Sequence, residues 1–358
     1  MYRSTRLAVA VLFAAAPLGA QGMSDVLRLH GFANWGAGHS DGGVYEYASK
    51  RTSVDAGSFA LVFNAAPAAK VNVVGQLGFN GLGHDETEAK LDILFAQYSV
   101  SDALKLNVGR VKQPFGLFTE LFDVGTARNM LALPHGIYDL SGMMGEVYNG
   151  VGLTGGVYSG DARWGLRYDA YVGDVTIQTT RPWEQDPNER TRVFHEVVGT
   201  HAVLETPIRG LSFGLSGYTG HLFDTTDVGS GERHGVSAAQ VEWMRDRWTV
   251  RAELASQTEG GLREDAGYVE GTYYLTTRWQ VVTRFDRSRA FGDDAIGASN
   301  ALLHHSDVAG GLNFWVSPGF VLRADVHSVN GNRFIAPLGV SRLGERTHIV
   351  QVGSQFSF

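Results

Sequence analysis

Apolar and polar residues alternate over much of the chain. The last ten residues, IVQVGSQFSF, place Val350, Val352, Phe356 and Phe358 on one side and mainly polar residues on the other. The same period of two occurs in RWGLRYDAYV (163–172), RWTVRAELAS (247–256) and GFVLRADVHS (319–328). This is the period of a β-strand, in which successive side chains point to opposite faces. The pattern therefore predicts an all-β protein.

The segments between the alternating stretches are short and long in turn. The short ones are rich in Asp, Gly, Pro and Arg, as tight turns are. They lie at 100–104, 159–163, 206–210, 244–248, 275–279 and 316–320. The longer, polar ones lie near 37–52, 80–89, 112–147, 174–192, 222–233, 257–265, 289–302 and 330–345. This rhythm predicts about sixteen strands of roughly 10–13 residues in a closed antiparallel up-and-down transmembrane β-barrel.

A secreted β-sandwich or β-helix is the soluble alternative. Sandwich strands average about five or six residues, roughly half the length expected here. An aromatic residue also recurs just after the short turns, at the same depth on several strands, as the interface girdle of a membrane barrel requires. These aromatic residues are Trp164, Phe213, Trp248, Trp279 and Phe320. Both observations favour the barrel.

The N-terminal segment has the layout of a secretory signal peptide. Arg3 and Arg6 precede an apolar run from Leu7 to Ala16, followed by Pro17 and small residues. The run is shorter than the ~20 residues of a spanning helix. We expect a signal peptide over 1–20 and the barrel domain over 21–358. No later apolar run approaches spanning length, so a helical membrane protein is not predicted, and export points to the outer membrane of a Gram-negative bacterium.

Composition excludes several classes of function. The chain has no cysteine and a formal net charge of −7. Thiol chemistry and cysteine-based zinc sites are therefore impossible, and general nucleic-acid binding is not expected. The segment LHHSD contains His305 and Asp307 on one strand face and His304 and Ser306 on the other. These side chains do not converge, so we predict no catalytic set, no metal site and no cofactor.

The last strand has to pair with the first, because an open sheet edge is not tolerated in a bilayer. Phe358 would then lie on the lipid face at the periplasmic girdle, in line with Phe356, Val352 and Val350. A terminal Phe after alternating apolar residues resembles the signal by which outer-membrane barrels are recognised for insertion.

A barrel of about sixteen strands is too wide for side chains to fill, so its interior holds water. Four strands carry an Arg followed two residues later by an acid, which places both on one face. The predicted pore-lining residues are Arg167, Asp169, Arg251, Glu253, Arg284, Asp286, Arg323 and Asp325. Two interpretations remain open: a transverse field that guides ions, or structural pairing of the wall.

The long connector at 112–147 is too apolar for a solvent-exposed loop. We expect this third long loop to fold into the lumen and narrow it, with the alternative that it packs outside the barrel or on a partner subunit. The predicted constriction residues are Arg110, Lys112, Glu120, Asp123, Arg128 and His135. Arg110 shares the parity of lipid-facing Leu106 and Val108, so it reaches the lumen only if the strand ends or bulges near Gly109.

The segment GRVKQPFGLFTELFDVGTARNMLALPHGIYD (109–139) resembles the corresponding segment of the phosphate-selective (O/P-like) and related Gram-negative porins. The matching positions are Gly109, Arg110, Pro114, Gly116, Asp123, Arg128, Pro134 and Tyr138. The resemblance implies a sixteen-stranded barrel, with its own pore, in a homotrimer. Phosphate-selective members carry many lysines at the pore entrance, whereas this chain has only Lys50, Lys70, Lys90, Lys105 and Lys112. Phosphate selectivity is therefore not predicted.

Together these features predict an outer-membrane porin. It would surround itself with outer-membrane lipid and let small ions or solutes diffuse passively through a water-filled lumen. The alternatives are a barrel enzyme of the lipase or protease type and a barrel that serves as an adhesin without conducting. A porin performs no covalent chemistry, so we do not predict an enzyme.

Overall fold

The computed structural model describes residues 27–43, 45, 48–49, 53–80, 88–138, 143–160, 163–179, 190–222, 231–292, 298, 300–334 and 346–358. The predicted signal peptide lies outside these residues. The described part contains no helix long and apolar enough to cross a membrane.

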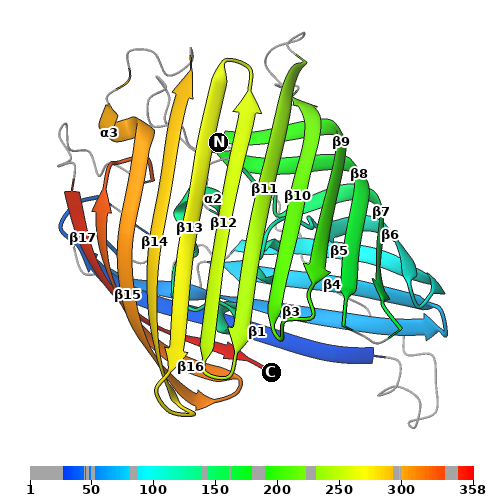
Figure 1. Cartoon of the computed structure of the whole chain (residues 1–358), viewed down its shortest axis with the longest axis horizontal. Coiled ribbons are helices and arrows are strands. Elements are labelled where there is room, and N and C mark those ends of the chain that lie inside the picture. Colours follow the sequence, from blue (N-terminus) through cyan, green and yellow to red (C-terminus); the bar gives the residue numbers. More distant parts are fainter. Residues whose placement is uncertain are drawn as a thin grey trace, which may run out of the picture.

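The chain forms a closed antiparallel barrel of sixteen long strands, as the alternation predicts (Figure 1). The strands are β1 (Leu27–Ser40), β3 (Ser53–Ala68), β4 (Val71–Asn80), β5 (Glu88–Ser101), β6 (Leu104–Lys112), β7 (Val147–Tyr158), β8 (Gly165–Thr179), β9 (Arg190–Glu205), β10 (Leu211–Leu222), β11 (Glu232–Arg245), β12 (Trp248–Glu259), β13 (Leu262–Tyr274), β14 (Trp279–Gly292), β15 (His304–Ser317), β16 (Phe320–Asn330) and β17 (Arg346–Ser357). A two-residue strand, β2 (Ala48–Ser49), pairs in parallel with β1.

The barrel closes between the first and last long strands. Phe32 pairs with Ser357 and Ala37 with Val352. Beyond the last strand residue, the backbones of Gly31 and Phe358 exchange hydrogen bonds of 2.9 and 3.1 Å. Phe358 is 57% exposed on the outer face, so the terminal aromatic residue lies where the sequence predicts, and the sheet has no open edge at this seam.

The prediction of a long loop is wrong for one of the connectors. The segment 257–265 was expected to be a loop, but β12 runs to Glu259 and β13 begins at Leu262, with a tight turn at Gly260 and Gly261. Gly260 has a φ of +54°, which glycine adopts without strain. The two strands therefore rise to the outer rim as one continuous hairpin, and polar strand ends in this region resembled a loop.

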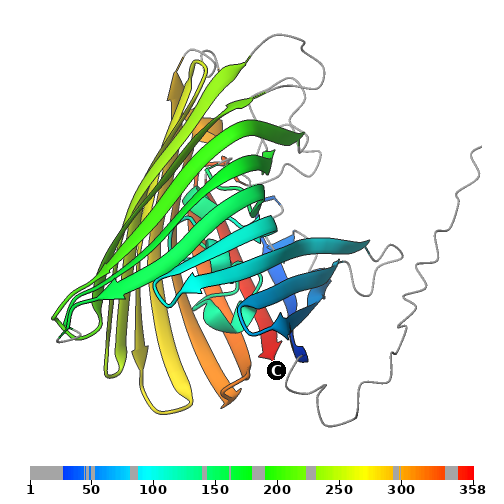
Figure 2. The ribbon, with the colours of Figure 1, turned by 90° about the vertical axis from the view of Figure 1, so that its right-hand side faces the viewer.

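The connector between β6 and β7 is the long loop that the sequence predicts inside the barrel. It contains two 3₁₀ turns, η1 (Thr119–Leu121) and η2 (Gly125–Ala127), and the short helix α2 (His135–Tyr138). Figure 2 shows this segment within the cylinder of strands. α2 contacts β13 and β14, and η2 contacts β17 and β1, so the loop leaves β6 and reaches two separate parts of the wall, three to five strands apart.

Candidate pore constriction

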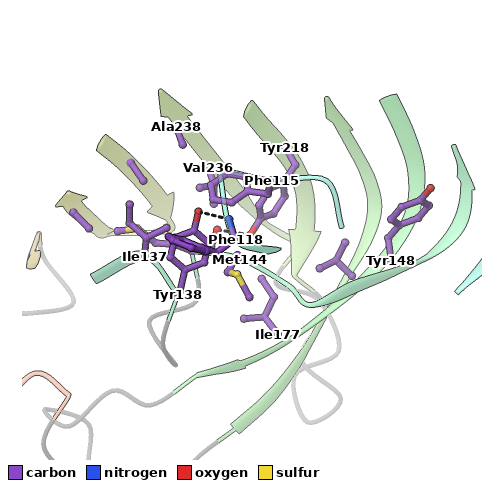
Figure 3. Packing of buried hydrophobic residues seen from close by; sticks show 14 of the residues in the cluster. Phe115, Phe118, Ile137, Tyr138, Met144, Tyr148, Ile177, Tyr218, Val236 and Ala238 are labelled. Atoms are coloured by element: carbon purple, nitrogen blue, oxygen red, sulfur yellow. Dashed lines mark hydrogen bonds between the residues drawn. The ribbon is translucent and has the colours of Figure 1, made fainter. Parts of the chain in front are cut away.

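The apolar side chains of the loop, here called the constriction loop (113–146, with 139–142 not described), pack against one side of the inner wall (Figure 3). Phe115, Phe118, Ile137 and Tyr138 are almost fully buried. They share a cluster with inward-facing wall residues, including Tyr171, Val175, Tyr218, Val236 and Tyr268. Apolar loop residues and apolar wall residues remove each other from water, which explains why the loop folds inward.

Glu253 on β12 holds the beginning of the constriction loop. Its carboxylate accepts hydrogen bonds of 2.6 Å from the hydroxyls of both Tyr138 and Tyr268, and one of 3.0 Å from the backbone N–H of Leu117. Gly116 has a φ of +60°, and a Cβ there would lie 2.3 Å from the Tyr138 hydroxyl. The loop can make this close approach only because residue 116 is glycine.

Arg323 and Asp325 on β16 hold the middle of the loop. Arg323 donates to the carbonyls of Gly125 and Met130 at 3.1 and 3.2 Å, and also to the carbonyl of Arg128. The Asp325 carboxylate accepts from the N–H of Leu131 at 2.6 Å.

Arg284 and Asp286 on β14 do the same for the end of the loop. Arg284 donates to the Ala132 carbonyl at 2.8 Å, and Asp286 accepts from the Gly136 N–H at 3.4 Å. Both side chains are buried. Each Arg–acid pair on these strands thus binds at least one loop carbonyl and one loop amide, which the loop's irregular backbone cannot pair internally.

The eight predicted lining residues therefore divide into three groups. Glu253, Arg284, Asp286, Arg323 and Asp325 face inward but are covered by the loop. Arg251 binds Glu242 on the neighbouring strand and lies over the Phe118 ring at 5.2 Å. Arg167 and Asp169 remain open to the lumen, and Arg167 pairs with Glu205 at 3.2 Å. Most of these residues hold the loop and the wall, which is the structural interpretation of the pattern.

The opposite side of the loop carries charges and faces β4–β8. Lys112, the last residue of β6, donates to Asp123 at 2.5 Å and to Glu146 at 2.6 Å. Gln76 on β4 also donates to Asp123, at 2.8 Å. Burial by itself raises the pKa of Asp123, but the Lys112 ammonium and these hydrogen bonds hold it below its ordinary value.

A second cation joins this cluster from β5. Lys90 lies 3.6 Å from both Asp92 and Glu146. Lys112 and Asp123 are among the predicted constriction residues, whereas Lys90, Asp92, Gln76 and Glu146 are not. Glu146 stands at the end of the predicted loop, so its position in the sequence could have identified it. The other three depend on the register of β4 and β5, which contains a bulge between Gln76 and Leu77.

Between the loop and this part of the wall lies a cavity of about 280 Å³. Lys112 and Glu120 line it from the loop side, and Asn107, Thr154 and Asp169 line it from the wall. Partial removal from water raises the pKa of Glu120, and the negative charge of Asp169 adds to this, while Arg167 acts in the opposite direction. This is the open, charged side of the constriction loop.

Three predicted constriction residues lie elsewhere. Arg110 is on the outer face: its cross-strand neighbours are exposed Leu94 and Asn149, and it donates to the Asp92 carbonyl at 2.8 Å. Because β6 continues past Arg110 to Lys112, Arg110 stays on the same outer face as Leu106 and Val108. The prediction that Arg110 is a constriction residue is therefore wrong. Arg128 folds back on the Phe122 carbonyl and ring.

His135 is buried in a cluster of titratable side chains, away from the cavity. Its Nδ1 lies 2.8 Å from the Tyr45 hydroxyl, and Tyr45 also donates to Asp307, which binds His327 at 2.7 Å. Burial, and then the positive charge of His305 and Arg284, lower the pKa of His135 well below its ordinary value. A neutral, enclosed His135 positions α2 and does not line the open space.

The fold and its interior define a class: a large porin-type barrel with a loop held across its lumen. Among solved structures, the anion-selective porin from Comamonas acidovorans superposes with a TM-score of 0.63 at 11% identity, over 93% of this chain and 99% of that one. The outer membrane channel DcaP of Acinetobacter baumannii gives 0.62 at 11%, over 93% and 97%. OmpT of Vibrio cholerae, described as a trimer form, gives 0.56 at 9%, over 93% and 99%.

These superpositions establish the fold, and sequence identities of 9–11% do not distinguish one subtype of porin from another. None of the three structures is described as phosphate-selective. No family model and no curated protein matches the chain. The predicted resemblance therefore holds for the porin barrel as an architecture.

Proposed function

We propose that the protein is an outer-membrane porin of a Gram-negative bacterium, through which small hydrophilic solutes and ions diffuse passively. The observation that supports this is the two-sided constriction loop. One side is fixed to β10–β16 by buried apolar contacts and charged hydrogen bonds, while the other presents ionisable groups to a cavity along β4–β8. A loop that only sealed the barrel would not need a charged side facing open space.

The charge on the open side favours cations. Carboxylates of Asp92, Glu120, Asp123, Glu146 and Asp169 outnumber the ammonium groups of Lys90 and Lys112 in this region. Arg128 is folded back on Phe122, and Arg167 is paired with Glu205. Field lines concentrate in a narrow, low-dielectric passage, so an excess of negative charge raises the local concentration of cations. We propose moderate cation selectivity, and a homotrimer by analogy with the trimer form of the Vibrio neighbour.

Planar-bilayer recording tests the proposal. Purified full-length protein should give discrete conductance steps and, in a salt gradient, a reversal potential of the sign expected for cations. Deleting part of 117–132 should raise the step size, because this removes the loop from the lumen. A barrel that is correctly folded but electrically silent would instead favour the enzyme or adhesin alternatives.

A further inference from the structure

The outer wall of the barrel carries a groove of about 820 Å³ across β10–β14. Its floor consists of small outward residues, Ala239, Ala252 and Gly267, and its sides are Phe213, Leu254 and Phe285. At its upper end the lining changes to Asp265, Arg287, Arg289 and Phe291. The groove therefore joins a long apolar channel to a charged end.

The charged end lies at the level of the lipid headgroups. On β14 the outward residues from the lower girdle are Trp279, Val281, Thr283 and Phe285, followed by Arg287 and Arg289. Eight residues separate Trp279 from Arg287, about 27 Å along an extended strand and about 20 Å along the membrane normal at the usual barrel tilt. The apolar band of an outer-membrane barrel is about 25 Å tall, so Arg287 marks its upper limit.

The two arginines at this limit are unpaired among the residues that the structure describes. Both side chains are exposed, and none of the described residues forms an ion pair with either of them. The neighbouring Arg263 is different, since it pairs with Asp265 at 3.0 Å and lies over the Phe291 ring at 5.3 Å. Asp265 also accepts from Ser256 at 2.6 Å. Asp265 is the cross-strand neighbour of Arg289, but it is engaged by Arg263 and Ser256, and the three arginines outnumber this carboxylate. The groove thus ends in an excess of positive charge.

We propose that this groove binds a membrane lipid with an anionic phosphate headgroup, with one acyl chain along the apolar channel and the phosphate on Arg287 and Arg289. Guanidinium groups match phosphate oxygens in geometry and charge. The small residues on the floor leave a depression in which a chain keeps its dispersion contacts over the length of the strand. The inference requires the barrel to lie in a membrane, as in the proposed function, but not to conduct.

Native mass spectrometry of the detergent-solubilised full chain measures the predicted binding. The probes are dioleoyl phosphatidic acid and dioleoyl phosphatidylcholine, which share acyl chains and differ in headgroup charge. The unmodified protein should retain phosphatidic acid about tenfold better, because its phosphate carries a net negative charge, whereas the phosphate of phosphatidylcholine is balanced by the choline ammonium of the same headgroup. Arg287→Gln with Arg289→Gln should remove most of this preference.

Two further variants keep the result interpretable. Arg209→Gln with Arg245→Gln removes two exposed arginines near the opposite end of the same wall, and should leave the preference unchanged. Ala252→Phe fills the groove floor and should reduce retention of both lipids. Equal retention of both lipids by the unmodified protein would overturn the proposal.

The proposal would also be overturned if Ala252→Phe changed the oligomeric state and left lipid retention unchanged. That result would assign this face of the barrel to a second copy of the chain. Conductance recorded on the same samples separates this inference from the proposed function, because either can fail while the other holds.

Discussion

Arg323 and Asp325, two residues apart on β16, bind adjoining parts of the same loop from one strand face. Arg323 binds the carbonyls of Gly125 and Met130, and Asp325 binds the N–H of Leu131. Two residues at positions i and i+2 of a strand lie on the same face, about 7 Å apart. A strand can therefore present a donor and an acceptor in register with an irregular loop segment.

Removing both anchors should release the middle of the constriction loop. Arg323→Ala with Asp325→Ala avoids leaving one buried charge unpaired, which would cost about 3–5 kcal/mol and could disturb the barrel itself. We expect a larger and noisier single-channel conductance, measured in planar bilayers. Arg346→Ala, an exposed outward residue on β17, is the matched control and should behave as the unmodified protein. Unchanged conductance in the double variant would mean that the loop stays in place without these contacts.

Gly116 should be sensitive to the smallest substitution. Gly116→Ala brings a Cβ to within 2.3 Å of the Tyr138 hydroxyl and 2.5 Å of Glu253, at a residue whose φ is +60°. Backbone strain and the broken Glu253 network should cost on the order of 1–3 kcal/mol. The temperature at which the barrel unfolds in detergent, followed by its altered gel mobility, should fall. Gly271→Ala is the control, because its Cβ would meet open space. A similar loss in both variants would point to general sheet weakening.

Period-two alternation was sufficient to predict the barrel, the inward parity of Arg284 or Arg323, and the place of Phe358, because each strand has one face in lipid. The same alternation could not show what the inward face touches. Arg323 binds loop backbone from Gly125 to Met130, almost 200 residues earlier in the chain, and no local pattern encodes that contact.

The apolar character of the loop did predict that it lies inside, since residues such as Phe115 and Ile137 need burial. Which of its charged residues face open space depends on how the loop turns. His135 follows Pro134 into α2 and is buried, whereas Glu120 in η1 is open to the cavity. The register bulge near Gln76 similarly concealed the contact between Gln76 and Asp123. These outcomes depend on tertiary packing and could not be derived from spacing.

The excess of carboxylates beside the cavity should set ion selectivity. Glu120→Gln with Glu146→Gln removes two negative charges and should move the reversal potential toward anions. Each charge beside a narrow passage that still contains water and salt is worth about 0.5–1 kcal/mol, so the permeability ratio should change by about twofold to fivefold per charge. Glu205→Gln, which removes a carboxylate at the short-turn end of β9 and frees Arg167, tests whether position matters and should have a smaller effect. A reversal potential that does not move would remove these carboxylates from the ion path.

Selectivity should also depend on pH through Glu120. Its pKa is raised, first by partial removal from water and then by the negative charge of Asp169, with Arg167 opposing the shift. A raised pKa means that Glu120 takes up a proton at a higher pH than an ordinary carboxyl group. Cation preference should therefore begin to decline in mildly acidic solution, before exposed carboxylates titrate.

The variant Glu120→Gln isolates this effect, since it lacks the titrating group. Its reversal potential should be less cation-selective at neutral pH and should stay nearly constant over the range in which the unmodified protein changes. Asp123 should not contribute in that range, because the Lys112 ammonium holds its pKa below the ordinary value. If Glu120→Gln retains the full pH dependence, the titrating group is a different one, and the open side of the loop does not control passage.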